Sequence, residues 1–245
     1  MDLELAHVSD FHASGSWFDA AAFESGVQRV NDLGVDHVVF TGDLVDHGTT
    51  AEFDRTLGLL DRFDAPVSPV MGNHDAMREG WRLFADRLLD GQRYYTRDWD
   101  GVRFVGLDSA EPDVNEGHIG REQMEWFQGH MGSGVPTVVA LHHHLLPVPG
   151  TGRERNILLD AGEMLRTITQ ARVPLVLTGH KHQPWAWNLE GTVIATTGTF
   201  CSTKTNSGQN FNHVRLSDER LHIDNVDAHT GTRRTLCDVA LEVAA

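Results

Sequence analysis

The sequence has few of the residues that mark a secreted or membrane-bound protein. Only two of its 245 residues are cysteines, Cys201 and Cys237. Two are too few for a disulfide scaffold, and we expect both to be reduced in a cytoplasmic protein. No apolar run approaches the roughly 18 residues that a membrane-spanning helix needs. A strand-like segment begins within the first few residues, so we expect neither a signal peptide nor a membrane span.

Basic residues are also scarce. The 20 Lys and Arg face 35 Asp and Glu, which gives a formal net charge of −15, and only two of the basic residues are lysines, Lys181 and Lys204. An excess of negative charge repels polyanions, so polymeric nucleic acid and anionic membranes are not expected as partners. Apolar residues make up 40% of the chain, which is enough for a substantial core.

Strand-length apolar runs alternate with helix-period segments up to Pro184, and strands separated by turns follow it. This order predicts an α/β layered sandwich with mixed sheets. We find no linker, repeat or low-complexity tract, so residues 1–245 are predicted to form a single domain. The predicted strands are Leu3–Val8, His37–Thr41, Val67–Met71, Val102–Leu107, Thr137–Leu141, Leu175–Thr178, Trp185–Leu189, Thr192–Thr196, Phe211–Leu216, Arg220–Val226 and Thr235–Val243.

Three sequence signals predict where helices begin and end. Gly34 follows a segment of helical apolar spacing and is a natural C-terminal stop. Thr49 with Glu52, and Asp160 with Glu163, have the spacing of a capping box, in which the two side chains satisfy free amides at a helix N-terminus.

Five of the predicted strands are followed directly by side chains that commonly bind metals. The loops beyond the carboxyl ends of strands are where ligands bind in α/β sheets. Glycine leads three of the clusters, and we expect it to let the backbone turn so that the next side chain points across the sheet edge. A lone motif is weak evidence, since Asp227-Ala228-His229 repeats Asp-x-His in what we interpret as a solvated turn. The clusters are Asp10-Phe11-His12, Gly42-Asp43-Leu44-Val45-Asp46, Gly72-Asn73-His74-Asp75, His142-His143-His144 and Gly179-His180-Lys181-His182.

The order of these clusters resembles the calcineurin-like metallophosphoesterase superfamily, over residues 10–182, or about 70% of the chain. The resemblance implies a four-layer α/β/β/α sandwich with two metal ions at the strand ends. The side chains that it assigns to the metals are Asp10, His12 and His182 for one ion, Asn73, His142 and His180 for the other, and Asp43 as a bridge between the two.

The donor types suit this assignment. A mixed set of oxygen and imidazole ligands favours Mn, Fe or Zn over Ca²⁺ and Mg²⁺, and leaves the choice among the three open. Two such ions about 3.5–4 Å apart can hold a hydroxide as nucleophile and clamp phosphoryl oxygens for in-line attack. We therefore expect a dinuclear metal-dependent phosphoesterase that hydrolyses small phosphodiesters by in-line attack of a metal-bridging hydroxide.

Two further residues are the predicted catalytic pair. His74 follows the metal ligand Asn73, and the resemblance places it near the leaving-group oxygen, where an imidazolium can act as general acid. Asp46 matches an Asp that in related enzymes hydrogen-bonds this His and fixes its tautomer. The alternative for Asp46 is a helix or turn cap.

Departures from the superfamily pattern narrow the substrate. Ser/Thr protein phosphatases carry Arg where this chain has His47, and diacylglucosamine-nucleotide hydrolases carry Arg at His74. The loop that begins at His142 is similar to that of small prokaryotic cyclic-nucleotide and glycerophosphodiester phosphodiesterases. The alternatives are a phosphomonoesterase, a nuclease of short single strands and, least favoured because all seven ligand positions are filled, a non-catalytic scaffold. Relatives often form dimers, so a homodimer is a further expectation.

The irregular segments 112–120 and 147–158 are candidate rims of a pocket. Arg153 and Arg155 could contact phosphate or lie in solvent, and His118 is expected at the surface rather than over the pocket. Trp185 and Trp187 share one face of a strand, where core packing explains them better than base stacking.

Overall fold

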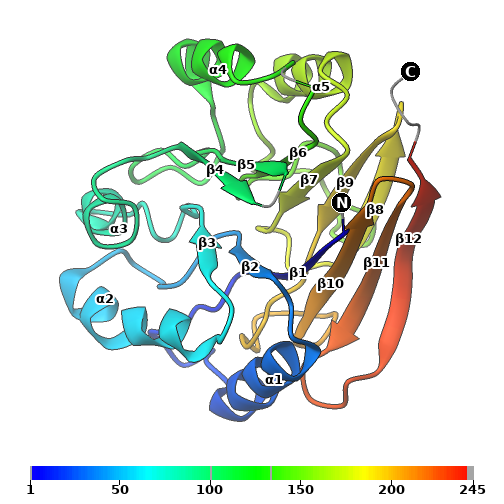
Figure 1. Cartoon of the computed structure of the whole chain (residues 1–245). Helices are drawn as coiled ribbons and strands as arrows, with labels where there is room; N and C mark the ends of the chain where they lie inside the picture. Colours follow the sequence, from blue (N-terminus) through cyan, green and yellow to red (C-terminus); the bar gives the residue numbers. More distant parts are fainter. Residues whose placement is uncertain (1, 100, 133, 242–245) are drawn as a thin grey trace.

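Two six-stranded mixed sheets form the centre of the protein (Figure 1). The computed structural model describes residues 2–99, 101–132 and 134–241. The first sheet has the order β12-β11-β10-β1-β2-β3, and the second has the order β4-β5-β6-β7-β9-β8. Strands β1, β2 and β3 are parallel, as are β5, β6, β7 and β9, while β10, β11 and β12 pair antiparallel.

The strands are β1 (Asp2–Val8), β2 (His37–Phe40), β3 (Val67–Pro69), β4 (Tyr95–Trp99), β5 (Val102–Gly106), β6 (Thr137–Ala140), β7 (Leu175–Thr178), β8 (Trp185–Leu189), β9 (Thr192–Thr196), β10 (Asn210–Ser217), β11 (Arg220–Asp227) and β12 (Arg233–Ala240). The helices are α1 (Ala20–Leu33), α2 (Thr50–Thr56) with the 3₁₀ helix η1 (Leu57–Arg62), α3 (Gly80–Leu88), α4 (Gly120–Gly129) and α5 (Ala161–Gln170).

The alternation of side chains along the strands separates the layers. In β6, Val138 and Ala140 belong to the large core cluster that both sheets share, whereas Val139 packs with Phe127 of α4 and Met164 of α5 in a second cluster. Helix α1 packs its apolar stripe onto the first sheet within the large cluster. Helices therefore cover the outer sides of the paired sheets (Figure 1), and the predicted α/β/β/α sandwich is confirmed.

Every predicted strand forms, and Leu175–Thr178, Trp185–Leu189 and Thr192–Thr196 have the predicted bounds. One strand, β4, was not predicted because exposed Arg97 and Asp98 interrupt its apolar pattern. The last predicted strand begins two residues earlier, at Arg233, and its final residues 242–243 lie outside the described part of the chain.

The helix ends agree with two of the three predicted signals. Gly34 ends α1 with φ of 65°, and Thr49 and Glu52 form the capping box of α2. The capping box predicted at Asp160 and Glu163 is wrong, because the Asp160 side chain makes no capping bond to α5. Its carboxylate instead accepts the amides of Ile119 and Gly120 at the start of α4, at 3.1 and 2.9 Å.

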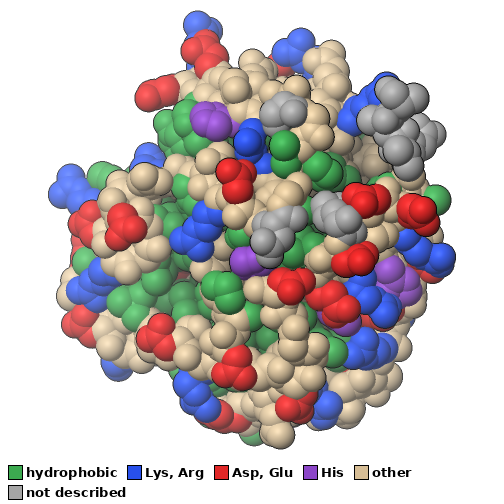
Figure 2. All heavy atoms as spheres, in the orientation of Figure 1, with side chains coloured by type: hydrophobic (Ala, Val, Ile, Leu, Met, Phe, Trp, Pro, Cys, Tyr) green, Lys and Arg blue, Asp and Glu red, His purple; other side chains and the backbone are tan. Residues whose placement is uncertain are grey.

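The surface carries the charges that the composition implies. Asp and Glu side chains are interspersed with Lys and Arg on the face that Figure 2 shows. Among the described residues, no helix combines the length and the apolar character needed to cross a membrane.

Candidate metal centre and substrate cavity

The five sequence clusters meet in space. Strands β1, β2, β3, β6 and β7 all end toward one edge of the sandwich, and each is followed there by its polar loop. The structure brings together all seven side chains predicted to bind metal, of which five are buried and two, His180 and His182, are partly exposed. They form two groups that share one member.

The first group consists of Asp10, His12, Asp43 and His182, whose candidate ligand atoms lie within 4.8 Å of one another. His182 Nε2 is 3.1 Å from Asp10 Oδ1 and 3.3 Å from His12 Nε2. Asp43 Oδ2 lies 3.7 Å from His12 Nε2. One carboxylate, two imidazoles and a shared second carboxylate thus face a common point.

The second group consists of Asn73, His142, His180 and the shared Asp43. Asn73 Oδ1 is 2.9 Å from His180 Nδ1 and 3.0 Å from His142 Nε2, and the two imidazole nitrogens are 3.2 Å apart. Asp43 Oδ2 also lies 3.4 Å from His142 Nε2. The same Asp43 oxygen therefore adjoins both groups.

The protonation pattern shows that these donors suit cations. His142 Nδ1 lies 2.6 Å from the Thr41 carbonyl, so this nitrogen carries the proton, and Nε2 of the neutral ring presents a lone pair to Asn73 Oδ1. His182 Nδ1 likewise donates to the Lys204 carbonyl at 2.5 Å. Its Nε2 faces Asp10 Oδ1, a buried oxygen without a hydrogen bond. A cation between the facing lone pairs satisfies both groups.

Added protons can take the place of those cations when no metal is bound. Burial lowers the pKa of His142, but the adjacent Asp43 carboxylate outweighs burial and raises the pKa to about 9. At His182, burial also lowers the pKa, but the adjacent Asp10 carboxylate outweighs burial, so the pKa is raised. Metal binding therefore competes with protons at this site.

A second set of contacts orients the donors. The Asn73 amide donates through Nδ2 to Asn115 Oδ1 at 3.4 Å, which turns its carbonyl oxygen toward His142 and His180. His12 Nδ1 is bonded to Asp46 Oδ1 at 3.1 Å, which leaves its Nε2 for the first group.

The expected hydrogen bond between His74 and Asp46 forms, but it goes to the main chain of Asp46. The Asp46 carboxylate binds His12 and accepts a hydrogen bond from the Ser14 hydroxyl at 2.7 Å, whereas His74 Nδ1 donates to the backbone carbonyl of Asp46 at 2.8 Å. Burial raises the pKa of Asp46, but the bonds from His12 and Ser14 outweigh it and lower the pKa to about 2. Asp46 thus fixes the His74 tautomer through its main chain, and it caps no helix.

The backbone at the site is strained. Asp10, His12, Asp43, His180 and His182 all have positive φ, between 45° and 70°. Residues other than glycine rarely adopt this left-handed backbone conformation, and such strain concentrates at functional sites. The turned backbone directs these side chains toward one another.

The glycines before the ligands serve two purposes. Gly42 has φ of 91°, as expected for a turn. Gly72 and Gly179 are required for a different reason, because a Cβ would lie 2.2 Å from Asp43 Oδ1 at Gly72 and 2.1 Å from Ser9 Oγ at Gly179. A Cβ at Gly42 would also lie 2.5 Å from Gly72 N, so all three glycines allow close approach between loops.

Asp75 has a role that our sequence interpretation did not assign. Its buried carboxylate accepts four backbone amides, from Asp43 and Leu44 at 2.8 Å and from Val45 and Gly72 at 3.1 Å. Burial, with the nearby Asp43 carboxylate, raises the pKa of Asp75 to about 7. Its place as the last residue of Gly-Asn-His-Asp is the signal that could have revealed it, since it joins the loops that carry Asp43 and Asn73.

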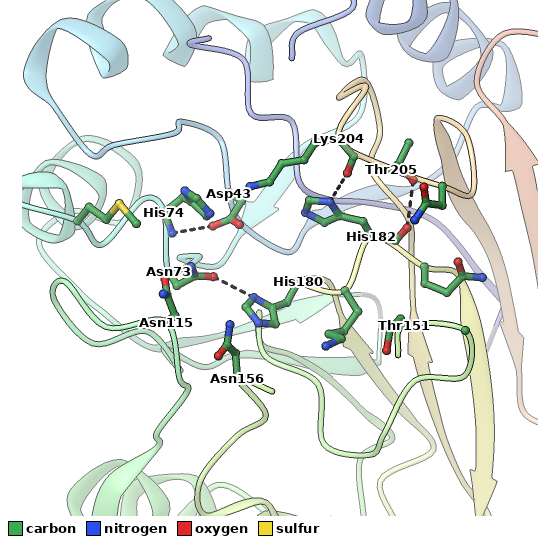
Figure 3. Close-up of a pocket in the computed structure, with 15 residues that line it drawn as sticks. Asp43, Asn73, His74, Asn115, Thr151, Asn156, His180, His182, Lys204 and Thr205 are labelled. Atoms are coloured by element: carbon green, nitrogen blue, oxygen red, sulfur yellow. Dashed lines mark hydrogen bonds between the residues drawn. The ribbon is translucent and has the colours of Figure 1, made fainter. Parts of the chain in front are cut away.

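A cavity of about 770 Å³ opens beside the two groups (Figure 3). Its lining includes His74, Asn115 from segment 112–120, and Gly150, Thr151 and Asn156 from segment 147–158, so both predicted rims are confirmed. Both lysines of the chain, Lys181 and Lys204, also line it, and sequence analysis gave neither a role.

The cavity is not lined by Arg153, Arg155 or His118. Arg153 and Arg155 are exposed. His118 pairs with Glu111 at 3.2 Å and lies 3.7 Å from Asp160, in agreement with the surface position expected for it.

The two residues that follow His142, His143 and His144, make contacts that stabilise the loop. His143 is buried and bonded to Ser109 Oγ at 2.8 Å and to the Asn115 carbonyl at 3.1 Å, and burial lowers its pKa to about 3. His144 Nε2 binds Glu154 at 2.8 Å. Of the three consecutive histidines, His142 is therefore the one whose free nitrogen faces the second group.

Comparison with known proteins agrees with this geometry. A family model described as calcineurin-like phosphoesterase matches residues 3–184. The chain belongs to the calcineurin-like phosphoesterase family. A probable cyclic nucleotide phosphodiesterase of Rhodococcus erythropolis is 26% identical, over 94% of this chain and 89% of its own. A cAMP/cGMP dual specificity phosphodiesterase of Mycobacterium tuberculosis is 28% identical, over 83% of this chain and 69% of its own.

Solved structures share the fold. A dimetal phosphatase from Danio rerio aligns with a TM-score of 0.73 at 13% identity, over 99% of both chains. A purple acid phosphatase from yellow lupin aligns with a TM-score of 0.70 at 13% identity, over 99% of this chain and 54% of its own. The prediction of a metal-dependent phosphoester hydrolase of this family is confirmed.

Proposed function

We propose that this phosphoesterase hydrolyses small phosphodiesters, with 3′,5′-cyclic nucleotides as the leading substrate class. The observation that carries the proposal is the position of Asp43 Oδ2, 3.7 Å from His12 Nε2 and 3.4 Å from His142 Nε2, between two complete donor groups. The named activities of the bacterial relatives support the choice of cyclic nucleotides. A cytoplasmic location, a single domain and a homodimer stay predictions.

Two transition-metal ions fit the donors. Asp10, His12 and His182 would hold one ion, Asn73, His142 and His180 would hold the other, and Asp43 would contact both. When bound, such a pair supplies Lewis acidity at the phosphoryl group and lowers the pKa of the attacking water. The choice among Mn, Fe and Zn is part of the test below.

His74 is the proposed general acid. Its backbone amide donates to Asp43 Oδ1 at 2.9 Å and its Nδ1 donates to the Asp46 carbonyl, so two contacts fix the ring at the cavity wall (Figure 3). Nε2 is then the atom left for the substrate. In the imidazolium form it gives its proton to the departing ester oxygen, which leaves as an alcohol.

The test is a substrate screen after reconstitution with Mn, Fe or Zn. The substrates are bis(p-nitrophenyl) phosphate, p-nitrophenyl phosphate, cyclic AMP, a glycerophosphodiester and a short single-stranded oligonucleotide. We expect cyclic AMP and the aryl diester to turn over faster than the monoester. A monoester hydrolysed a hundred times faster than every diester would overturn the diester assignment. Oligonucleotide cleavage that falls steeply with added salt would favour the nuclease alternative.

A further inference from the structure

The cavity wall holds an unusual share of the lysines. The chain has two lysines among 245 residues, and both line this cavity although the net charge is −15. The bound ester is an anion, and three carboxylates, Asp10, Asp43 and Asp46, lie in or beside the metal groups. A positive side chain at the wall would offset that charge.

Lys181 is already engaged by protein groups. Its ammonium lies 3.5 Å from Glu154 Oε1 and 3.4 Å from the Arg155 carbonyl, and its side chain is only 12% exposed. Glu154 is in turn bonded to His144 at 2.8 Å. The ammonium of Lys181 therefore joins the loop of residues 147–158 to the loop that carries His180 and His182.

Lys204 is not engaged in this way. Within the described ranges its ammonium forms no ion pair, and the residue is exposed. Figure 3 shows its side chain extending from its loop toward the part of the cavity where Asp43 and His74 lie.

The backbone that carries Lys204 is fixed to a proposed metal ligand. Its carbonyl accepts the Nδ1 proton of His182 at 2.5 Å, and its amide donates to Ser202 Oγ at 3.2 Å. The hydroxyls of Thr205 and Ser207 both donate to the His182 carbonyl, at 3.2 and 2.8 Å. The position of the Lys204 main chain relative to His182 is therefore set by several bonds.

No arginine takes this place. The position at which protein phosphatases carry Arg is His47, whose side chain is 62% exposed and bonded to Glu52 at 3.1 Å. Arg153 and Arg155 do not line the cavity. Among the described residues that line the cavity, Lys181 and Lys204 are the only Lys or Arg side chains, and Lys181 is paired.

We propose that Lys204 is a substrate-binding residue whose ammonium contacts the phosphoryl oxygens of the bound ester, on the His74 side of the cavity. The inference rests on the proposed function for its substrate. An ammonium acts on phosphate as a compact point charge, so it suits an ester whose oxygens are also held by metals.

The first test measures binding without turnover. Inorganic phosphate is titrated into the metal-loaded protein by calorimetry, for the wild type and for the Lys204→Met, Lys204→Arg and Arg153→Met variants. We expect Lys204→Met to weaken phosphate binding about tenfold or more, because it removes a charge-assisted hydrogen bond. Lys204→Arg should restore most of the affinity. Arg153→Met removes the same charge from an exposed site outside the cavity and should bind phosphate as the wild type does.

The second test separates this inference from the proposed function. Steady-state hydrolysis of a diester should show a raised KM in Lys204→Met with unchanged metal content, since the backbone that holds His182 is retained. Phosphate affinity and KM both equal to the wild type would overturn the role of Lys204 and leave the function standing. Weaker phosphate binding in Lys204→Met, in a protein that hydrolyses no diester, would support Lys204 and overturn the function.

Discussion

His142 Nε2 lies 3.0 Å from Asn73 Oδ1, although the Thr41 carbonyl holds the ring proton on the opposite nitrogen. Two lone pairs at this distance repel each other unless a cation or a proton lies between them. Burial lowers the pKa of His142, but the adjacent Asp43 carboxylate outweighs burial and raises it to about 9, so a proton competes with a metal ion for this nitrogen. The pair is therefore arranged for a cation.

Metal binding should release protons in a pH-dependent way. Below about pH 9, a metal ion must displace the His142 proton, so apparent affinity at the second group should rise about tenfold per pH unit until the pKa is reached. Calorimetry in buffers of different ionisation enthalpy at pH 7.5 measures the protons released. Proton release from His142 should fall toward zero above pH 9. A metal affinity of the second group that does not change between pH 6.5 and 8.5 would contradict the assignment of His142 as a metal ligand.

His74→Ala should retain both metals and lose turnover. The ring donates to the Asp46 carbonyl and lies edge-on to the His12 ring, whereas the bond to the Asp43 carboxylate comes from the backbone amide, which alanine retains, so the metal donors stay in place. We expect kcat to fall about 10²–10⁴-fold, the usual contribution of a general acid. His118→Ala, at a partly exposed histidine outside the cavity, is the matched control. Wild-type turnover in His74→Ala would remove His74 from the mechanism.

Asp46→Asn should act on metal affinity. Because the carboxylate orients His12 and the main chain orients His74, we expect the first ion to bind about 10–100-fold more weakly, while the second keeps its affinity. Titration with Mn²⁺ or Zn²⁺ resolves the two events. Loss of turnover with both metal affinities intact would show instead that the side chain serves His74.

Asp75→Ala should destabilise the fold. Its carboxylate satisfies four buried amides in the loops that carry Asp43 and Asn73, and each amide left unpaired costs about 1–3 kcal/mol. We expect the free energy of unfolding in urea to fall by at least about 3 kcal/mol in the metal-free protein. Asp75→Asn, which keeps an acceptor oxygen, should lose less, and equal stability of the alanine variant and the wild type would contradict this role.

The sequence predicted the layers well because the strands are short, apolar and bounded by turns. Strand β4 was missed because it is an edge strand whose exposed residues are charged, and only its ends, Tyr95 and Trp99, are buried. The cap at Asp160 was misassigned because spacing in sequence cannot show that α4 offers closer amides than α5.

The candidate site was predicted as a set of residues, but its connections were not. The motifs pointed to the seven donors and to His74, and the structure brings these together. Motifs do not distinguish a side chain from a main-chain carbonyl, so they did not show that the bond from His74 goes to the backbone oxygen of Asp46. Motifs also give no information about a cavity wall formed by a loop that is distant in sequence. The position of Lys204 at the cavity was therefore found only from the structure.

We propose that two metal ions share Asp43. Crystals of protein reconstituted with Mn²⁺ or Zn²⁺, measured at the absorption edge of the metal, locate those ions directly by anomalous scattering. We predict two peaks about 3.5–4 Å apart, with Asp43 between them, Asp10, His12 and His182 around one, and Asn73, His142 and His180 around the other. A single peak, or two peaks of which only one contacts Asp43, would contradict a dinuclear centre bridged by Asp43.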